Sequence, residues 1–243
     1  MPKMNLAEVR DAITSCERCP RLRTYCQRIA REKRAAYRND TYWAKPVPGF
    51  GDPLARVLVL GLAPAAHGAN RTGRNFTGDG RGGSGDFLMT AMHANGFANL
   101  STSQSIDDGL VLHDAWIAAA VRCAPPDNKP TPQEIANCHS HLMAELDALP
   151  NLRVYVALGR IAFDAVLRLF KARGWRPAKR PLFEHGGIIR IPGAPVIVCA
   201  YHPSRQNTHT GRLTADMLRD ALRTAKRLAQ KTCRSLPDTT RPR

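Results

Sequence analysis

Four short runs of consecutive apolar residues occur along the chain and predict its buried strands. They cover residues 57–60, 115–121, 154–158 and 196–200. Each run is apolar at every position rather than at every second one, which is typical of strands that are covered on both faces of a parallel sheet. We therefore expect four parallel strands at the centre of the fold.

The segments between these runs carry apolar residues at helical spacing. The strongest helix start is at Thr131, where Thr131 and Glu134 form a capping box with Pro132 at the first helical position. Further helices are predicted after Ser84, over residues 161–174 and from Ala215 onward, whereas residues 98–113 are predicted to be a surface loop. Alternating strands and helices predict an α/β fold, a three-layer α/β/α sandwich around a four-stranded parallel sheet.

Small or polar residues follow the predicted strands at their carboxyl ends. A loop of Gly, Ala and Pro begins at Gly61, a turn covers residues 119–123, and a polar loop begins at Tyr201. Right-handed crossovers bring the carboxyl ends of parallel strands to one edge of the sheet, where open α/β sheets place their ligands. We expect these three loops to be neighbours and to form a site.

The composition indicates how many domains the chain forms and what kind of partner it binds. The chain has 243 residues, of which 43% are hydrophobic. This content suits one core, so we expect a single domain over residues 1–231 and a disordered tail over residues 232–243. The net charge of +16, from 36 Lys and Arg against 20 Asp and Glu, favours a polyanion such as nucleic acid over a neutral metabolite.

The hydropathy pattern argues against a membrane protein. No apolar run reaches the roughly 18 residues that a spanning helix needs, and the first residues lack a signal-peptide core. We therefore expect a cytoplasmic protein. In a reducing compartment the seven cysteines are not expected to form a disulfide framework, which raises the question of metal binding.

Four of the cysteines can be grouped as metal ligands. Cys16 and Cys19 form a CxxC pair, Cys123 follows a strand, and Cys138 faces inward near the start of the capped helix. Four thiolates suit either zinc or a [4Fe–4S] cluster. The spacing does not choose between them, although the wide separation of the second pair favours iron–sulfur. The remaining cysteines are Cys26, Cys199 and Cys233.

His202 is the strongest catalytic candidate. It follows a strand and precedes Pro203, opposite the loop of small residues. A histidine there can donate a hydrogen bond to an oxygen on which negative charge develops. Short donors in the following loop are suited to holding phosphates, as are two arginines of the first loop. These candidate DNA-binding residues are Arg71, Arg74, Ser204, Arg205, Gln206, Asn207 and Thr208.

Three motifs together resemble the family 5 uracil-DNA glycosylases, the iron–sulfur branch of the uracil-DNA glycosylase superfamily. The motifs are GLAPAAHGANRTGRNFTGD, AVRCAPPDNKPTPQEIANC and YHPSRQNTHTGRLT, and the match runs from about Cys16 to about Leu228. The resemblance implies a four-stranded parallel α/β/α sandwich and a [4Fe–4S] cluster held by Cys16, Cys19, Cys123 and Cys138. It also implies double-stranded DNA with deaminated bases as the partner, and hydrolysis of the N-glycosidic bond to leave an abasic site. We expect a monomer that needs no nucleotide cofactor.

The resemblance also implies roles within the pocket. Phe76 would stack on the extruded base, and His202 would stabilise the departing base anion. The first motif offers only apolar side chains where related enzymes carry a water-positioning Asp, Asn or Glu, so backbone, His67 or Asp79 must hold the water. Ala119 stands where related enzymes carry an asparagine that reads the base, which predicts a broader specificity that includes hypoxanthine. The expected base-binding residues are Gly61, Leu62, Ala63, Pro64, His67, Phe76 and Ala119.

Three alternatives remain open from the residues alone. The four cysteines also suit an electron-transfer or redox-sensing iron–sulfur protein. A non-catalytic DNA-binding module stabilised by zinc or another metal centre is the second alternative. A nucleotide-binding enzyme is the third, but the sequence contains neither GxxxxGKS/T nor GxGxxG.

Overall fold

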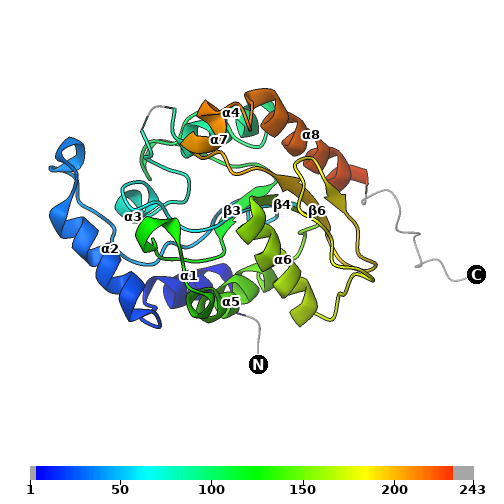
Figure 1. Cartoon of the computed structure of the whole chain (residues 1–243), viewed down its shortest axis with the longest axis horizontal. Coiled ribbons are helices and arrows are strands. Elements are labelled where there is room, and N and C mark those ends of the chain that lie inside the picture. Colours follow the sequence, from blue (N-terminus) through cyan, green and yellow to red (C-terminus); the bar gives the residue numbers. More distant parts are fainter. Residues whose placement is uncertain (1–3, 81, 232–243) are drawn as a thin grey trace, which may run out of the picture.

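The four apolar runs form the parallel centre of one sheet (Figure 1). In this computed structural model, which describes residues 4–80 and 82–231, these strands are β2 (Val57–Gly61), β3 (Ala115–Ala119), β4 (Val154–Leu158) and β6 (Val196–Ala200). Two strands of two residues each, β1 (Phe50–Gly51) and β5 (Ile188–Ile189), pair antiparallel at the edges. The order is β1-β3-β2-β4-β6-β5, so the described residues form a six-stranded sheet whose four-stranded parallel centre confirms the prediction.

Helices connect the strands, as the spacing of apolar residues predicts. The longer ones are α4 (Ser84–Ala94), α5 (Pro132–Asp147), α6 (Arg160–Ala172) and α8 (Ala215–Lys231). Two helices precede the sheet, α1 (Leu6–Thr14) and α2 (Pro20–Glu32). The short elements are α3 (Ala69–Thr72), α7 (Arg205–His209) and the 3-10 turns η1 (Ala35–Tyr37) and η2 (Pro126–Asn128).

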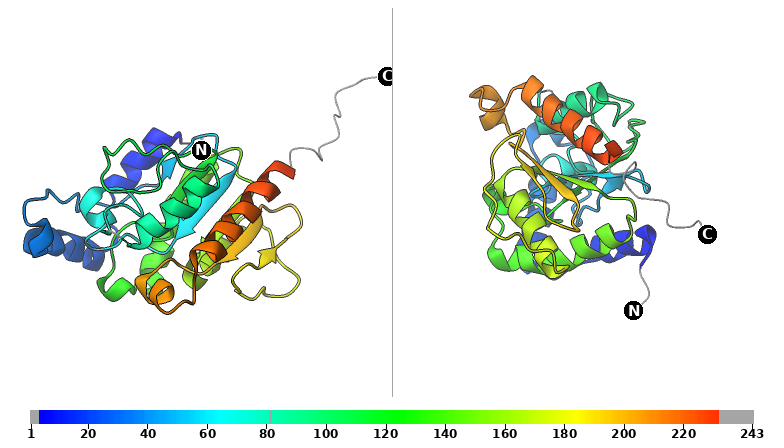
Figure 2. Two further views of the ribbon diagram at one scale, coloured as in Figure 1. Left: turned by 90° about the horizontal axis from the view of Figure 1, so that it is seen from above. Right: turned by 90° about the vertical axis from the view of Figure 1, so that its right-hand side faces the viewer.

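Both faces of the sheet are covered, which gives three layers (Figure 2). Val57 and Val59 of β2 lie in the core that α4 and α8 complete, whereas Leu58 and Leu60 lie in the core that α5 and α6 complete. Successive side chains of a strand point to opposite faces, so a run that is apolar at every position suits this burial. The predicted α/β/α sandwich is confirmed.

The capping box at the start of α5 is present. The hydroxyl of Thr131 accepts from the Glu134 amide at 3.2 Å, and the Glu134 carboxylate accepts from the Thr131 amide at 2.7 Å. The same carboxylate receives two hydrogen bonds from Arg21 of α2, at 2.8 and 2.7 Å. This cap therefore also fixes α2 against the first turn of α5, and the segments that carry Cys19 and Cys138 lie together.

The structure differs from the prediction in two segments. The polar stretch after His202 is not an irregular loop, because it contains the short helix α7. Ser204 caps this helix, and its Oγ accepts a hydrogen bond from the Asn207 amide. The stretch over 98–113 is not a simple surface loop, because Leu112 and Ser103 are buried and Ala98 bridges to Leu112.

Two further expectations concern the membrane and the chain end. Within the described part of the chain, no helix is long and apolar enough to cross a bilayer. The predicted disordered tail, residues 232–243, lies outside the described residues.

Candidate active site

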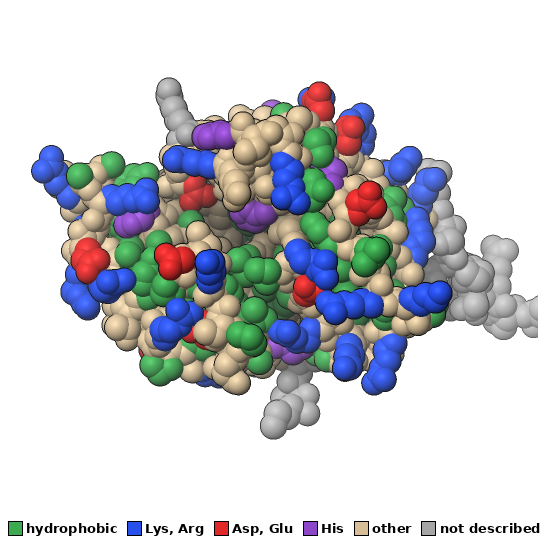
Figure 3. All heavy atoms as spheres, in the orientation of Figure 1, with side chains coloured by type: hydrophobic (Ala, Val, Ile, Leu, Met, Phe, Trp, Pro, Cys, Tyr) green, Lys and Arg blue, Asp and Glu red, His purple; other side chains and the backbone are tan. Residues whose placement is uncertain are grey.

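A pocket opens where the strands end, between loops far apart in the sequence. Gly61 ends β2, Ala119 ends β3, and His202 follows β6, and all three line this pocket together with Phe76 and Asp79. Right-handed crossovers place these ends at one edge, and the predicted meeting of the three loops is confirmed. Figure 3 shows a hollow near the centre of this face, with His side chains at its edge and Lys and Arg side chains around it.

Phe76 and His202 form two walls of the pocket. Their ring centroids are 5.8 Å apart and the rings are inclined by 31°. Phe76 has a φ of 53°, in the left-handed region that few residues other than glycine adopt. A Cβ on Gly61 would lie 3.0 Å from the Phe76 ring, so glycine at this strand end leaves the space that the ring occupies. The backbone at Phe76 is thus held in a strained conformation at the pocket wall.

His202 is neutral over the ordinary pH range. Burial lowers the pKa of its imidazole to about 4, because a charged ring would lose its hydration there. The Asn207 side chain and the Ser204 amide both donate to the His202 carbonyl oxygen at 2.8 Å, which fixes its backbone. A neutral ring in this position can donate a hydrogen bond without carrying a charge into the pocket.

Asp79 lines the same pocket, and its pKa is shifted in the opposite direction to that of His202. Burial raises the pKa of its carboxyl to about 6, although a hydrogen bond from the Gly85 backbone and the nearby Arg205 favour the charged form. A Cβ on Gly68 would lie 1.8 Å from Asp79 Oδ1, so the carboxylate occupies space that only a glycine leaves free. A carboxyl that is largely ionised at neutral pH and has a pKa near that range suits proton transfer.

Some of the remaining predicted pocket residues line the pocket and others do not. Ala63 and Pro64 do. Leu62 does not belong to the lining, and its carbonyl accepts from the Val121 amide at 2.9 Å. His67 lies in an adjacent groove, where its Nδ1 is 2.9 Å from the Tyr42 hydroxyl. The lining also includes four residues absent from the sequence-based set, Ala65, Ala69, Asn75 and Ser84.

Asn75 is a polar residue in the same lining as Ala119. It is 2% exposed, and its Nδ2 donates to the Pro48 carbonyl at 3.0 Å, which fixes the side chain. In the sequence it follows Arg74 within the first motif, and this polar neighbourhood is the signal that could have identified it. Only the fold, however, brings Pro48 to its side chain and Asn75 itself to the pocket.

The adjacent groove holds about 290 Å³ and shares Ala65 and Asp79 with the pocket. Arg34 and Arg205 line it, and Tyr25 and Tyr37 add aromatic rings. Among the residues the structure describes, neither of these arginines is in an ion pair with a carboxylate. A groove with these cations and rings matches the chemistry of a nucleic-acid strand.

Two arginines predicted to contact DNA are used inside the protein instead. Arg74 is 6% exposed and binds Asp108 at 2.7 Å, among other partners. Arg71 binds Asp40 at 2.5 Å and the Gly78 carbonyl at 2.7 Å, and its guanidinium stacks over the Tyr37 ring. Neither guanidinium is free for a phosphate in this structure, because burial and internal partners occupy both. Arg205 of α7 remains exposed at the groove.

The cysteines predicted as ligands lie close together around the start of α2, the end of β3 and α5. Cys19, Cys123 and Cys138 are buried in one cluster together with Cys26, and Cys16 is half-buried. Burial raises the thiol pKa of Cys138, and the proximity of Cys19 and Cys16 contributes to this shift. All of these thiols are free. Within residues 4–80 and 82–231, no three His, Cys, Asp or Glu side chains are arranged as a metal site.

Comparisons with known proteins agree with this geometry. The model of the uracil DNA glycosylase superfamily matches residues 48–226. The type-5 uracil-DNA glycosylase of Thermus thermophilus is 51% identical, over 89% of this chain and 95% of its own. That of Mycobacterium leprae is 45% identical, over 93% and 96%. The type-4 enzyme of Archaeoglobus fulgidus is more distant, at 32% over 58% and 63%. The chain belongs to the uracil-DNA glycosylase superfamily, and within it to the type-5 uracil-DNA glycosylases.

Proposed function

We propose that this protein removes uracil from double-stranded DNA by hydrolysing its N-glycosidic bond. The observation that carries this proposal is the pocket in which Phe76, His202 and Asp79 meet at the carboxyl edge of the sheet. The names of the type-5 relatives support the same activity. The products are free uracil and an abasic site.

The base must leave the duplex to reach this pocket. Extrusion costs a few kcal/mol and costs least for a mispaired base such as uracil opposite guanine. Phe76 would stack on the face of the extruded base. Arg205 and the donors from Ser204 to Thr208 would hold the flanking phosphates, which the exposure of Arg205 beside the pocket supports.

Bond cleavage places negative charge on the base and positive charge on the sugar. As the bond between C1′ and the base nitrogen breaks, its electron pair moves onto the base, and the sugar becomes oxocarbenium-like. His202 would donate a hydrogen bond to the base oxygen that gains charge. A neutral imidazole suits this role, because its donation strengthens as the charge develops.

Water completes the reaction at C1′. We assign Asp79 to hold and deprotonate this water, since its carboxyl lines the pocket and is the acidic side chain there. Oxygen bonds to C1′, the water proton moves to Asp79, and the base anion later takes up a proton. His67 fits this role less well, because it lies in the groove and is paired with Tyr42.

We also propose that the pocket accepts bulkier deaminated bases such as hypoxanthine. Ala119 offers no hydrogen bond to the base, so the discrimination that an asparagine gives is absent on that wall. Asn75 would read the base from another wall. Duplexes with hypoxanthine and uracil in the same sequence test this point, and cleavage of uracil alone would show a narrow pocket.

The activity is tested with a duplex that carries one uracil opposite guanine. Alkali cuts the strand at each abasic site, so cut strand reports excision. We expect cleavage by the parent protein and a loss of about 10²–10³-fold in the single-turnover rate for His202→Ala, by analogy with the removal of an oxyanion-stabilising donor. A parent protein that binds this duplex without cleaving it would instead support the binding-module function.

We further propose that Cys16, Cys19, Cys123 and Cys138 hold a [4Fe–4S] cluster. The donor set supports this, since the thiols are free, act on one another electrostatically and gather where α2, β3 and α5 meet. The cluster would supply structural order to the segment of α1 and α2, and no step of the reaction passes through it. Purified protein should be brown and contain iron and acid-labile sulfide in equal amounts.

A matched pair of variants separates ligands from neighbours. Cys138→Ser should lose iron, whereas Cys26→Ser, at a buried neighbour in the same cluster of residues, should keep it. Colourless protein that contains zinc would instead support a zinc site at these cysteines.

We propose in addition that residues 1–231 act as one domain, and that the protein acts on DNA as a monomer in the cytoplasm.

A further inference from the structure

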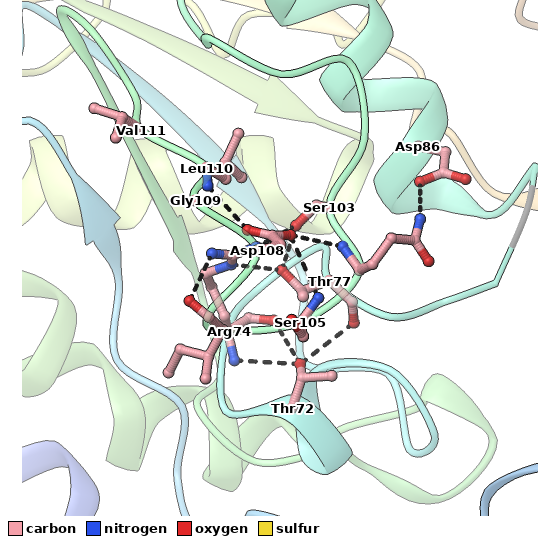
Figure 4. A network of polar contacts seen from close by, with 12 residues as sticks. Thr72, Arg74, Thr77, Asp86, Ser103, Ser105, Asp108, Gly109, Leu110 and Val111 are labelled. Carbon is pink, nitrogen blue, oxygen red and sulfur yellow. Dashed lines mark hydrogen bonds and ion pairs between the residues drawn. The ribbon is translucent and has the colours of Figure 1, made fainter.

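A buried polar network lies behind the pocket wall and has no part in the chemistry proposed above (Figure 4). At its centre is Arg74, two residues before Phe76. Its guanidinium donates to Thr77 Oγ1 at 2.9 Å, Ser103 Oγ at 3.0 Å, the Ile106 carbonyl at 3.2 Å and Asp108 at 2.7 Å. We call Arg74, Thr77, Ser103 and Asp108 the Arg74 cluster.

Asp108 ties the loop that faces Arg74 into one shape. It accepts from the Gln104 amide at 2.8 Å, the Ser105 amide at 3.3 Å and the Leu110 amide at 3.0 Å. Burial opposes ionisation of this carboxyl, but the hydrogen bond from Arg74 and those from the amides outweigh it and lower its pKa. A charged Asp108 thus joins Arg74 to its own loop, residues 103–110.

The Arg74 cluster holds the backbone on both sides of Phe76. Thr77 is fully buried, and its hydroxyl lies 2.6 Å from that of Ser103. The Gly78 amide donates to the Ser103 carbonyl at 2.9 Å. The contacts therefore fix residues 74, 77 and 78, and Phe76 between them is held at its φ of 53°. A strained conformation persists only where its surroundings fix it.

Resting on the proposed function, we propose that the Arg74–Asp108 pair is the positioning unit that presents Phe76 and Asp79 to the extruded base. The pair stands behind the pocket wall and touches no substrate. It acts through the backbone of residues 76–79, so its loss would move the stacking ring and the carboxylate together. A displacement of about 1 Å in a catalytic group can reduce a rate by about 10²-fold.

Asp108→Asn tests the unit, because it keeps the shape of the side chain and removes its charge. The matched control is Asp114→Asn, which weakens the Arg56–Asp114 ion pair at the opposite end of β3. We expect Asp108→Asn to slow single-turnover excision of uracil by at least about tenfold, with affinity for uracil-free duplex within about twofold of the parent. Asp114→Asn should keep the parent rate. Equal losses in both variants would reduce the effect to general stability and overturn the proposal.

Two further variants test whether the pair acts through Phe76. Arg74→Lys keeps the charge but lacks the planar fork that reaches four partners, so it should be as slow as Asp108→Asn. In a Phe76→Ala background, where stacking is already lost, Asp108→Asn should slow excision by a smaller factor than it does in the parent, because only the displacement of Asp79 remains and interacting residues are not additive. A full multiplicative loss in that background would contradict a role through Phe76.

Hydrogen exchange separates this proposal from the activity on which it rests. Asp108→Asn should speed amide exchange over residues 76–79 by about tenfold or more, and Asp114→Asn should not. Unchanged exchange in Asp108→Asn would overturn the positioning role even where the parent is active. A parent that fails to excise uracil while Asp108→Asn loosens residues 76–79 would count against the proposed function and support the positioning role.

Discussion

At the scale of single residues, two titratable groups face one pocket with shifts in opposite directions. Burial lowers the pKa of His202 to about 4 and raises that of Asp79 to about 6. The same loss of hydration explains both values, because it favours the neutral form of each group. At neutral pH the pocket therefore presents a neutral donor and a largely ionised carboxylate, which is the pairing that leaving-group stabilisation and water activation require.

These values predict the pH dependence of excision. A carboxyl can accept the water proton only when ionised, so the single-turnover rate should fall about tenfold per pH unit below about pH 6. His202 stays neutral throughout this range and begins to protonate only near about pH 4. The measurement is the rate from about pH 4.5 to about pH 8 at saturating enzyme.

Asp79→Asn is the control for this profile. Its single-turnover rate should be low and should not fall further below about pH 6, since the amide of asparagine does not titrate in this range. If the rate of Asp79→Asn fell with decreasing pH as it does in the parent, the titration would belong to another group, which would contradict the role of Asp79 as the base.

Arg74 shows why part of the site could not be predicted from the sequence. In the sequence it lies near Arg71 in the first motif, and both arginines are predicted to contact DNA. Its partners Ser103 and Asp108 belong to a stretch that reads as a surface loop, and only the fold brings that stretch against Arg74. For Asp79, the burial that supports its proposed role could not be predicted either, because the close approach of its carboxylate to Gly68 is a property of the fold.

At the scale of elements, the fold was easier to predict than the site. Each central strand is a continuous apolar run, and the start of α5 carries its own capping signals, so local sequence determines both. By contrast, β1 and β5 have two residues each, and α7 has five polar residues without periodicity. Such short elements form because neighbouring strands and caps complete their hydrogen bonds, which the local pattern does not record.

One buried ion pair joins three elements beside the cysteines. Arg122, just beyond β3, donates to Glu145 of α5 at 2.8 Å, and their side chains are 1% and 2% exposed. Glu145 also accepts from the Gly49 amide, at 2.8 Å, beside β1. Removing one member of a buried pair leaves the other charge without compensation in a region that excludes water.

We therefore expect Glu145→Ala to lower the free energy of unfolding by about 3–5 kcal/mol. The comparison is Asp164→Ala, which removes the partly exposed partner of Arg160 and should cost no more than about 1 kcal/mol. Urea unfolding followed by circular dichroism measures both. A loss in Glu145→Ala as small as that in Asp164→Ala would mean that water reaches Arg122 and stabilises its charge.

At the scale of the whole molecule, the net charge of +16 is not all available to DNA. Arg219 and Arg223 on the outer face of α8 pair with Asp216 and Asp220 one turn away, and Arg74 is buried. The groove beside the pocket differs, since Arg34 and Arg205 line it. The positive charge that matters for binding should therefore be concentrated at the groove rather than spread evenly over the surface.

The salt dependence of DNA binding tests this distribution. Each phosphate neutralised by the protein contributes about 0.9 to the slope of log affinity against log salt. Arg205→Ala should therefore reduce the magnitude of that slope by about 0.9 and weaken binding to every sequence alike, because a phosphate contact carries no base information. Arg223→Ala, which removes an equal charge from the outer face of α8, should leave the slope unchanged. The assay is the affinity for uracil-free duplex between about 50 and about 200 mM salt. Equal slopes for the two variants would mean that net charge alone attracts DNA, and that the groove does not define the path of the strand.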